Sequence, residues 1–391
     1  MPWREVKPMD EKVLFIADYL RSDDSMTMLC QRYGISRKTG YKWVNRYHAK
    51  GMDGLREQSR EPQNSPTKTP YVVRKAIVEI RKKRGRIGAK KLRVLLAKQF
   101  PEELIPSKTT INNILTQEGL VLPNKKRNRV SPYAQPFAPV NAPNELWSAD
   151  FKGQFKTRNG RWCYPLTVMD HDSRFLLGCE GLDGTRFRES KAVFEQLFRE
   201  YGLPHRVRTD NGVPFASRAA GGLSSLSVWW IRLGIMPERI KPGRPQQNGR
   251  HERMHRTLKQ AVTRPPAASR SAQQKRFDEF CQDYNYERPH EALNQSTPAS
   301  RYRPSLKPYP EKLPELEYPS YFEIKKISSH GIAYWRGRYI YISHLLIGET
   351  IGMSEVDDGI WDVYFGHLRI GIFDERDMKG RSVPYITIKK V

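Results

Sequence analysis

The 391-residue sequence is poor in cysteine, in long apolar runs and in acidic residues. Its four cysteines, Cys30, Cys163, Cys179 and Cys281, form no Cys-x-x-Cys pair, which excludes a zinc ribbon and a disulfide framework. No run of about 18 apolar residues is present, so a membrane span is excluded. The first residues lack the apolar stretch of a secretory signal. We therefore expect a cytoplasmic protein with no membrane partner.

The charge is strongly unbalanced. Lysine and arginine number 68 against 42 acidic residues, which gives a formal net charge of +26. Such a charge favours a polyanionic partner, and nucleic acid is favoured over a membrane because no amphipathic membrane helix stands out. Residues 313–391 hold ten basic and eleven acidic residues, so the excess lies in residues 1–312. Charge alone does not tell whether the protein only binds nucleic acid or also cuts it.

Residues 1–58 read as three short helices at 10–20, 25–33 and 36–47, and a chain of this length is expected to hold two to four domains. Gly34 stops the second helix and Ser36 can cap the third, which is a helix-turn-helix layout. Gly40 stands where such motifs usually bury an aliphatic residue. A small helical bundle that binds no DNA is the alternative. The residues expected to face a major groove are Arg37, Lys38, Thr39 and Lys42.

Residues 68–120 read as a second helix-turn-helix. Ten basic residues and one acid lie between Arg74 and Arg93, more than an ordinary solvated helix face carries. Gly88 opens one helix and Ser107 caps another, whose outward residues Lys108 and Asn112 we expect to contact DNA.

Residues 121–145 contain Lys125, Lys126 and Arg127 and five prolines. They offer no apolar periodicity, so we expect an extended basic linker that lies along a DNA backbone.

Residues 146–302 change to a pattern of strands and helices. Three strand-like runs are followed by alternating helices and strands, which predicts an α/β sheet flanked by helices. The expected strands are 146–151, 163–169, 175–180, 206–209 and one near 235; the expected helices are 188–201, 224–233, 248–262 and 271–286. Residues 317–391 alternate apolar and polar residues, with a hairpin turn at Asp358-Gly359, and predict a small β-barrel.

Three acids fall where this fold would bring them together. Asp150 lies on the first strand, Asp210 ends the fourth, and Glu252 lies in the first turns of a helix. If the two strands are neighbours, their carboxylates lie side by side, and a helix packed across the sheet can add the third. Oxygen ligands of this kind suit Mg²⁺ or Mn²⁺, and two such ions about 3.5–4 Å apart support phosphodiester chemistry without a covalent intermediate.

Each acid also has a simpler explanation. Asp150 can be a solubility residue on an edge strand, Asp210 can belong to a tight turn, and Glu252 can pair with Arg256 one turn on. His251 and His255 can suggest a zinc pair, but no third ligand is evident. The order of the three acids along a basic chain favours the metal site.

The motifs around these acids resemble those of the retroviral-integrase-like DDE transposases of bacterial insertion sequences. They are Trp147-x-x-Asp150, Thr209-Asp210-Asn211-Gly212-x-x-Phe215, Gln247-Asn248-Gly249-x-x-Glu252-Arg253, Arg256-Thr257-Leu258-Lys259 and Tyr284-Asn285-x-x-Arg288-Pro289-His290-x-Ala292-Leu293. The resemblance covers about residues 10–302. The spacing from Asp210 to Glu252 is longer than the family's usual one, and the excess lies around Ser217 to Ser227.

The resemblance implies a multidomain protein with helix-turn-helix modules and a ribonuclease-H-like catalytic core. It implies that Asp150, Asp210 and Glu252 are catalytic and bind two Mg²⁺ ions, with Mn²⁺ as a substitute, and that Asn248 and Lys259 lie near DNA. The implied activity is 3′-end cleavage of a mobile element and strand transfer into target DNA. The implied partners are double-stranded DNA and further copies of the chain in a synaptic complex, on the bacterial nucleoid in the cytoplasm.

Two other functions compete with this one. A non-catalytic DNA-binding regulator derived from a transposase explains the basic modules but has no need of three acids. A structure-selective nuclease acting alone explains the acids but not the two recognition modules. The joint presence of acids and modules favours the transposase.

Overall fold

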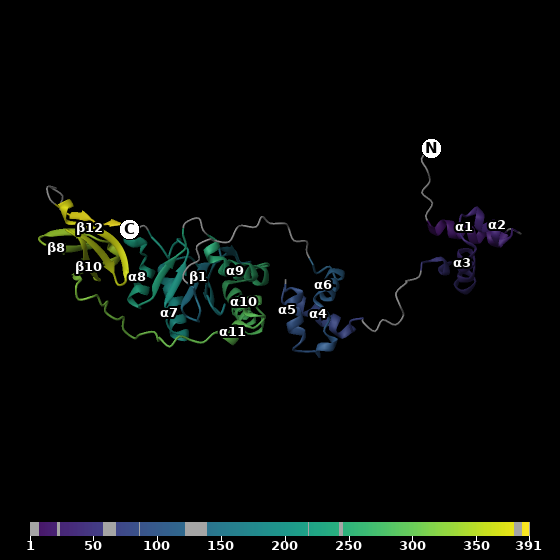
Figure 1. Ribbon diagram of the computed structural model, residues 1–391, viewed down its shortest axis with the longest axis horizontal. Coiled ribbons are helices and arrows are strands. Elements are labelled where there is room, and N and C mark those ends of the chain that lie inside the picture. The colour runs from purple at the N-terminus through teal and green to yellow at the C-terminus, as the bar shows by residue number, and fades with distance from the viewer. Residues whose placement is uncertain are drawn as a thin grey trace, which may run out of the picture. The chain divides into compact units, whose positions relative to one another are not determined.

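The computed structural model of the chain describes residues 8–21, 24–57, 68–85, 87–121, 139–217, 219–241, 245–378 and 385–390 (Figure 1). Two compact units, Met1–Lys68 and Thr69–Val391, divide the chain.

The first unit contains the three helices that the sequence predicts. They are α1 (Pro8–Arg21), α2 (Met26–Arg32) and α3 (Arg37–Lys50), followed by the 3₁₀ turn η1 (Gly51–Leu55). Ser25 and Ser36 cap α2 and α3, because each hydroxyl accepts a hydrogen bond from a backbone N–H of the first turn. Phe15, Leu29 and Trp43 lie in the shared core.

Gly40 is buried in α3 because the neighbouring helix leaves no room for a side chain. A Cβ at this position would lie 2.5 Å from Cys30 Sγ and 3.2 Å from both Met26 Sδ and Phe15 Cζ. Side chains of α1 and α2 therefore fill the volume that an aliphatic residue of α3 would otherwise occupy.

The second group of helices, which we call the second module, belongs to the second unit. It consists of α4 (Tyr71–Lys83), α5 (Ala89–Leu96), η2 (Glu102–Leu104) and α6 (Lys108–Gln117). Ile77, Leu92 and Ile111 are completely buried between the helices. Helix α4 therefore has an apolar face that packs in the core of the module and a basic face towards solvent, which includes Lys82 and Lys83.

The central sheet has the mixed topology that the sequence predicts. Its strands are β1 (Leu146–Phe151), β2 (Phe155–Lys156), β3 (Trp162–Asp170), β4 (Leu176–Leu182), β5 (Arg206–Thr209) and β6 (Met236–Arg239). β1 pairs antiparallel with β3 and parallel with β5, while β4 pairs with β3 and β6 with β5. The strands with Asp150 and Asp210 are therefore neighbours.

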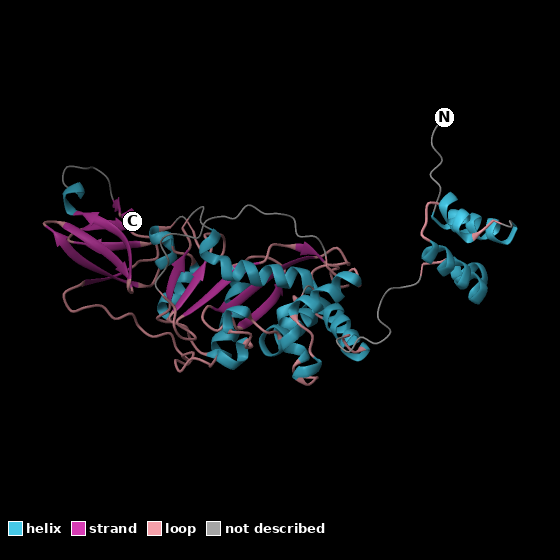
Figure 2. Cartoon of the chain, turned by 45° about the vertical axis from the view of Figure 1, so that its right-hand side comes forward, coloured by secondary structure: helices cyan, strands magenta, loops and turns pink. Residues whose placement is uncertain are grey.

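Helices cover both faces of this sheet, as Figure 2 shows for the magenta strands between cyan helices. On one face lie α7 (Phe187–Tyr201) and α8 (Ser225–Arg232); on the other lie α9 (Gly249–Val262) and α10 (Arg270–Gln282). Trp147, Phe198 and Trp230 fill the first interface, and each such side chain stabilises the fold by about 1.5–3 kcal/mol.

Shorter helical turns connect these elements. They are η3 (Ala220–Gly222), η4 (Pro245–Asn248), the π turn η5 (Asp283–Glu287), η6 (Glu291–Leu293) and α11 (Pro298–Arg301).

The C-terminal strands form two open sheets, and the predicted β-barrel is not confirmed. The strands are β7 (Glu323–Lys326), β8 (Ile332–Trp335), β9 (Arg338–Tyr341), β10 (Thr350–Asp357), β11 (Ile360–Phe365), β12 (Leu368–Asp374), β13 (Tyr385–Thr387) and β14 (Lys389–Lys390), with turns η7 (His344–Leu346) and η8 (Glu375–Met378). Within the described residues, β14-β12-β11-β10-β7 form one sheet and β13-β9-β8 the other.

Among the described strands, no backbone pairing joins the two sheets, and side chains pack between them instead. Trp335 of the smaller sheet packs against Trp361 and Phe373 of the larger one, with ring centroids 4.6 and 5.8 Å apart. β13 and β14 are separated by one residue, Ile388, yet pair with strands of different sheets. The buried aromatic layer thus covers both inner faces without closing a barrel.

The C-terminal sheets share their apolar core with α8 and with the segment that precedes it. Ala220, Leu223 and Ile231 belong to the same buried cluster as Ile370 of β12. Arg232 of α8 also pairs with Glu349 at 2.6 Å. The extra residues around Ser217 to Ser227 therefore contribute to the surface against which the C-terminal sheets pack.

Candidate active site

Asp150 lies in β1, and Asp210 is the residue that follows β5, the parallel neighbour of β1. β1 and β5 pair Leu146 with Arg206 and Ser148 with Arg208, and the same register carried two residues further sets Asp150 opposite Asp210. Alternation along β1 points Trp147 into the α7–α8 interface and Ser148 towards α9. Asp150 therefore points to the α9 side of the sheet.

Helix α9 runs beside β1 on this face. His251 Nδ1 lies 2.9 Å from Ser148 Oγ, and one turn later His255 Nδ1 lies 3.8 Å from Asp150 Oδ2. The buried face of α9 also includes Met254. Glu252 lies about 100° around the helix axis from His251, and His255 is displaced in the same direction. The side chain of Glu252 is exposed.

Asp150 is influenced electrostatically by the other two acids. Burial, followed by the charge of Asp210 and then that of Glu252, raises the pKa of Asp150 to about 7; a backbone hydrogen bond from Phe151 and the charge of Lys152 oppose the shift. A partly buried carboxylate near other negative charges is stabilised by a proton or by a cation. The charges of this cluster therefore favour a positive ion among the three side chains.

The donor chemistry fits a hard divalent cation, although the side chains do not enclose one as they stand. No group of three His, Cys, Asp or Glu side chains within the described ranges is spaced to hold a metal ion. The three acids supply oxygen atoms only, which suits Mg²⁺ or Mn²⁺ better than zinc. Glu252 is the exposed member of the three, and its side chain has three rotatable bonds, so its carboxylate is the one with most freedom to move.

The histidines of α9 are structural, so the zinc alternative finds no support in their contacts. His251 and His255 each place Nε2 2.7 Å from the hydroxyl of Thr167. Burial lowers the pKa of His251 to about 3 and that of His255 further still, so both rings are neutral. Thr167 Oγ1 also donates to the carbonyl of Asp150 at 2.9 Å. These contacts tie α9 to the strand that carries the first acid.

Asn248 and Lys259 lie on either side of the acids along α9. Asn248 is buried, and its Nδ2 donates to Asp150 Oδ2 at 3.5 Å. Lys259 is exposed, and its charge reaches Lys152, whose pKa is lowered first by burial and then by Lys259. At one end of the site the Asn248 amide contacts Asp150, and at the other end lie the positive charges of Lys152 and Lys259.

The predicted DNA contacts are placed as follows. Arg37, Lys38 and Lys42 are exposed on α3, whereas Thr39 is half-buried and its hydroxyl lies 2.9 Å from Ser36 Oγ in the helix cap. Lys108 and Asn112 are exposed on α6. The basic linker residues Lys125, Lys126 and Arg127 lie outside the described residues.

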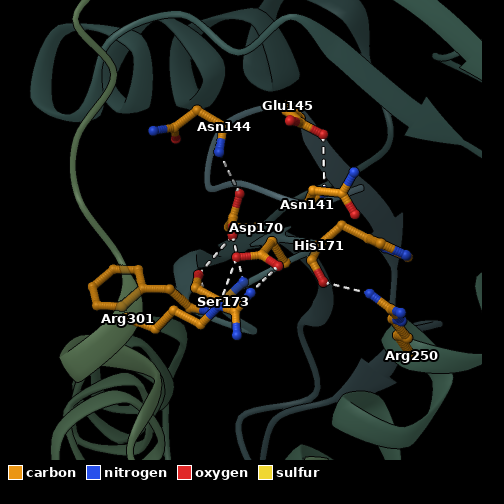
Figure 3. A network of polar contacts seen from close by, with 10 residues as sticks. Asn141, Asn144, Glu145, Asp170, His171, Ser173, Arg250 and Arg301 are labelled. Carbon is orange, nitrogen blue, oxygen red and sulfur yellow. Dashed lines mark hydrogen bonds and ion pairs between the residues drawn. The ribbon is translucent and has the colours of Figure 1, made fainter. Parts of the chain in front are cut away.

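Sequence reasoning missed a network of polar contacts behind the site (Figure 3). Buried Asp170, at the end of β3, accepts hydrogen bonds from Asn144 N at 2.8 Å and from Ser173 Oγ at 2.6 Å. The next residue, His171, accepts at its carbonyl from Arg250 at 2.8 Å, which fixes the start of α9. Only an Asp-x-x-Ser turn after a strand could have signalled this network in the sequence.

Sequence reasoning also missed Arg239, which connects the Asp210 strand to the C-terminal sheets. Arg239 pairs with Thr209 in the β5–β6 register, and its guanidinium donates to the carbonyls of Gly221 and Gly222. Both glycines have a positive φ, of 60° and 64°. A Cβ on Gly222 would lie 1.9 Å from the guanidinium, and one on Gly221 would lie 2.9 Å from Ile370. Glycine is thus required at both positions, because the segment packs closely against Arg239 on one side and Ile370 on the other.

Family models match the chain in four places. A helix-turn-helix domain matches residues 11–62 and a homeodomain-like domain matches residues 39–115. Two integrase core domain models match residues 140–245 and 233–298. The fold and the site thus define a protein with an integrase core preceded by helix-turn-helix regions.

Two similar proteins from bacteria allow a more specific family assignment. An uncharacterized 31.7 kDa protein of insertion element IS407 from Burkholderia multivorans is 30% identical over 231 residues, which cover 57% of this chain and 78% of that protein. An uncharacterized 39.2 kDa protein of insertion element IS476 from Xanthomonas euvesicatoria is 26% identical over 276 residues, 69% of this chain and 75% of that protein. The chain belongs to the integrase-like transposases of bacterial insertion sequences.

Among solved structures, the HTLV-2 integrase catalytic core in complex with magnesium matches with 16% identity and a TM-score of 0.33, over 41% of this chain and 97% of that one. A likeness at this level adds no argument to the family assignment. In the described part of the chain, no helix is both long and apolar enough to cross a membrane.

Proposed function

We propose that this transposase binds the ends of a mobile element and catalyses metal-dependent 3′-end cleavage and strand transfer into target DNA. The observation that supports the proposal is the placement of Asp150 in β1 and of Asp210 directly after β5, the parallel neighbour of β1, with α9 packed beside them. The raised pKa of Asp150, to which Asp210 and Glu252 contribute, supports the inclusion of all three acids.

In this proposal Asp150, Asp210 and Glu252 hold two Mg²⁺ ions, for which Mn²⁺ substitutes. When bound, these ions supply charge stabilisation and lower the pKa of a bound water or hydroxyl. Asn248 orients the Asp150 carboxylate through its amide, and Thr167 holds the Asp150 carbonyl, so the acid keeps one orientation on the strand.

The helix-turn-helix regions would hold double-stranded DNA at the element ends, with Arg37, Lys38 and Lys42 on α3 and Lys108 and Asn112 on α6 as contacts. Two or more copies of the chain would pair both ends in one complex.

The first test replaces each acid in turn: Asp150→Asn, Asp210→Asn and Glu252→Gln. Each change removes one ligand charge, so strand transfer in Mg²⁺ is expected to fall by about 10³-fold or more while DNA binding persists. Glu195→Gln is the matched control, because Glu195 lies on α7 and pairs with Arg199, one turn away on the same helix. Transfer at wild-type rate by any one of the three variants refutes that residue's role.

A second candidate is a non-catalytic DNA-binding regulator, which the wide spacing of the acids favours. The two are separated by incubating the protein with DNA that carries the element's terminal repeats in Mg²⁺. Nicking at the repeat end supports the transposase, and binding without nicking at every candidate end supports the regulator.

A stability measurement tests the charge cluster without any reaction. The pKa of Asp150 is about 7 in the folded protein and near its ordinary value when unfolded, so the metal-free fold binds more protons and loses stability as the pH rises from about 4 to 7. Asp150→Asn removes this penalty. Thermal unfolding without metal is expected to show the variant roughly 2–4 kcal/mol more stable at about pH 8, with the difference gone near pH 4. A variant that is less stable at both pH values contradicts the prediction.

A further inference from the structure

A groove of about 520 Å³ lies between the C-terminal end of α4 and the helices α9 and α10. It lies within the second unit, at the contact between the second module and the α/β layer. The basic residues that line it are Lys82, Lys83, Arg84, Arg264, Arg276 and Arg288, and we call it the cationic cleft.

Some of these cations are structural and others are available. Arg84 pairs with Asp283 and lies 3.6 Å from Glu287, which ties α4 to the helices of the core. In contrast, Lys82, Lys83 and Arg264 are exposed, and their side chains make no hydrogen bond or ion pair with another residue in the described part of the chain. Two acids also line the cleft: Asp283, which is paired with Arg84, and Glu279, which is exposed. The lining therefore has six basic residues against two acids, and three of the cations face solvent.

The available cations continue to the catalytic acids. Arg264 follows the end of α9, whose residues Gln260, Ala261 and Val262 line the cleft. Lys259 and Arg256 are exposed on the preceding turns of this helix, and Glu252 lies one turn before Arg256. Exposed positive charge therefore leads from the cleft along α9 towards Glu252 and towards Asn248, the residue that contacts Asp150.

Helix α5 of the second module contacts the α/β layer at η6, where Lys90 pairs with Glu291 at 2.5 Å. Lys91 of α5 has a pKa lowered to about 8, first by burial and then by the charges of Arg288 and Arg253, against which Glu291 acts. Arg253 is the neighbour of Glu252 on α9. The proximity of the positive charges of Lys91, Arg288 and Arg253 costs free energy unless a bound anion offsets their repulsion.

We propose that the cationic cleft holds the sugar–phosphate backbone of the DNA whose end is processed at the three acids, so that the second module and the active site of one chain grip the same DNA. The inference rests on the proposed function. A DNA backbone fits because it is a regular polyanion that extends from a recognition helix to the reacting phosphate, and the charges follow such a line. An acidic protein segment would need no continuation to Asp150.

The binding test uses the full chain with Asp150→Asn, so that no DNA is consumed. In this background Lys82→Gln/Lys83→Gln/Arg264→Gln is compared with Arg188→Gln/Lys312→Gln/Lys326→Gln, which removes the same charge from exposed residues that do not line the cleft. The probe is a random-sequence duplex titrated between about 50 and 200 mM salt. The cleft variant is expected to lose on the order of 10²-fold in affinity and to lower the salt slope by about 2.7, and the control by much less.

Equal losses for the two variants, or an unchanged salt slope for the cleft variant, overturn the proposal in favour of general charge attraction or of an acidic protein partner. This result is read from binding alone. It is therefore distinguishable from failure of the proposed function, in which the wild-type chain binds DNA but transfers no strand.

A mixing experiment tests whether one chain does both tasks. The cleft variant with intact acids is mixed with the Asp150→Asn protein with an intact cleft, and strand transfer is measured. If grip and chemistry belong to one chain, the mixture is expected to transfer no more than the two proteins alone. Transfer restored towards the wild-type level overturns the assignment to a single chain.

Discussion

Helices α3 and α6 share their capping chemistry but not the way their inner faces are filled. In each, a serine hydroxyl accepts a hydrogen bond at 3.2 Å from the N–H of a threonine three residues on: Ser36 and Thr39 in α3, Ser107 and Thr110 in α6. In each, the residues four, seven and eight positions after the serine are buried; they are Gly40, Trp43 and Val44 in α3, and Ile111, Ile114 and Leu115 in α6.

The difference falls at the first buried position. Ile111 supplies its own side chain to the core of the second module, whereas Gly40 leaves the space to Cys30, Met26 and Phe15. Equal periodicity therefore does not require equal side-chain volume at each position, because a neighbouring helix can supply the missing atoms. The comparison also explains why Gly40 is compatible with a helix-turn-helix.

The two regions differ again in their attachment. Lys90 and Lys98 of the second module pair with Glu291 and Glu287 of the α/β layer. The first region forms a separate unit, in which Lys12 pairs with Glu57 and Arg32 with Asp24. The second module is thus part of the unit that contains the acids.

The largest effect is expected from Ile111→Ala. The residue is completely buried, so the change leaves a cavity in the second module and is expected to cost about 2–5 kcal/mol of unfolding free energy. Hydrogen exchange of α4 to α6 in the full chain measures the loss. Exchange that rises equally in α1 to α3 would contradict the separate cores seen here.

The reverse change, Gly40→Leu, is expected to cost about 1–3 kcal/mol in the first unit, because its Cβ would meet Cys30 Sγ at 2.5 Å. The comparison is sharpened by Gly40→Ala in a Cys30→Ala background, where the sulfur is gone and alanine favours the helix by about 0.5–1 kcal/mol over glycine. Thermal unfolding of this pair against Cys30→Ala alone gives the sign. A further loss of stability on adding Gly40→Ala would show that the side chains of Met26 and Phe15 do not move enough to accommodate the added methyl group.

The smallest effect is expected from the caps. Ser36→Ala and Ser107→Ala each remove one hydroxyl acceptor and are expected to cost about 1 kcal/mol. Because the cap geometry is the same, the two losses are expected to agree within a few tenths of a kcal/mol. Unequal losses in local hydrogen exchange would show that the shared cap is not equivalent in the two helices.

Much of the site could be predicted from the sequence because its residues stand at the ends of regular elements. Leu146–Phe151 and Arg206–Thr209 are found at the predicted bounds, and α9 begins at Gly249 as the motif predicts. The roles of Asp150, Asp210 and Glu252 remain predictions. The roles of Thr167 and His255 could not be predicted, because their partner atoms come from elements distant in sequence.

The C-terminal strands show the limit most clearly. Alternation predicted the hairpin at Asp358-Gly359, which β10 and β11 flank, but it led to a barrel where two open sheets are found. Alternation fixes which side chains share a face, and it does not fix which strand pairs with which.

The sequence by itself determined the positive charge, the capped helices, the strands and the three acids, because each depends on residues close together along the chain. Only the tertiary structure decided that β1 lies beside β5 and that Gly221 and Gly222 seat the C-terminal sheets. It alone also set the second module against α9. These depend on side chains meeting across long separations, where shape and packing select one partner among many that local pattern allows.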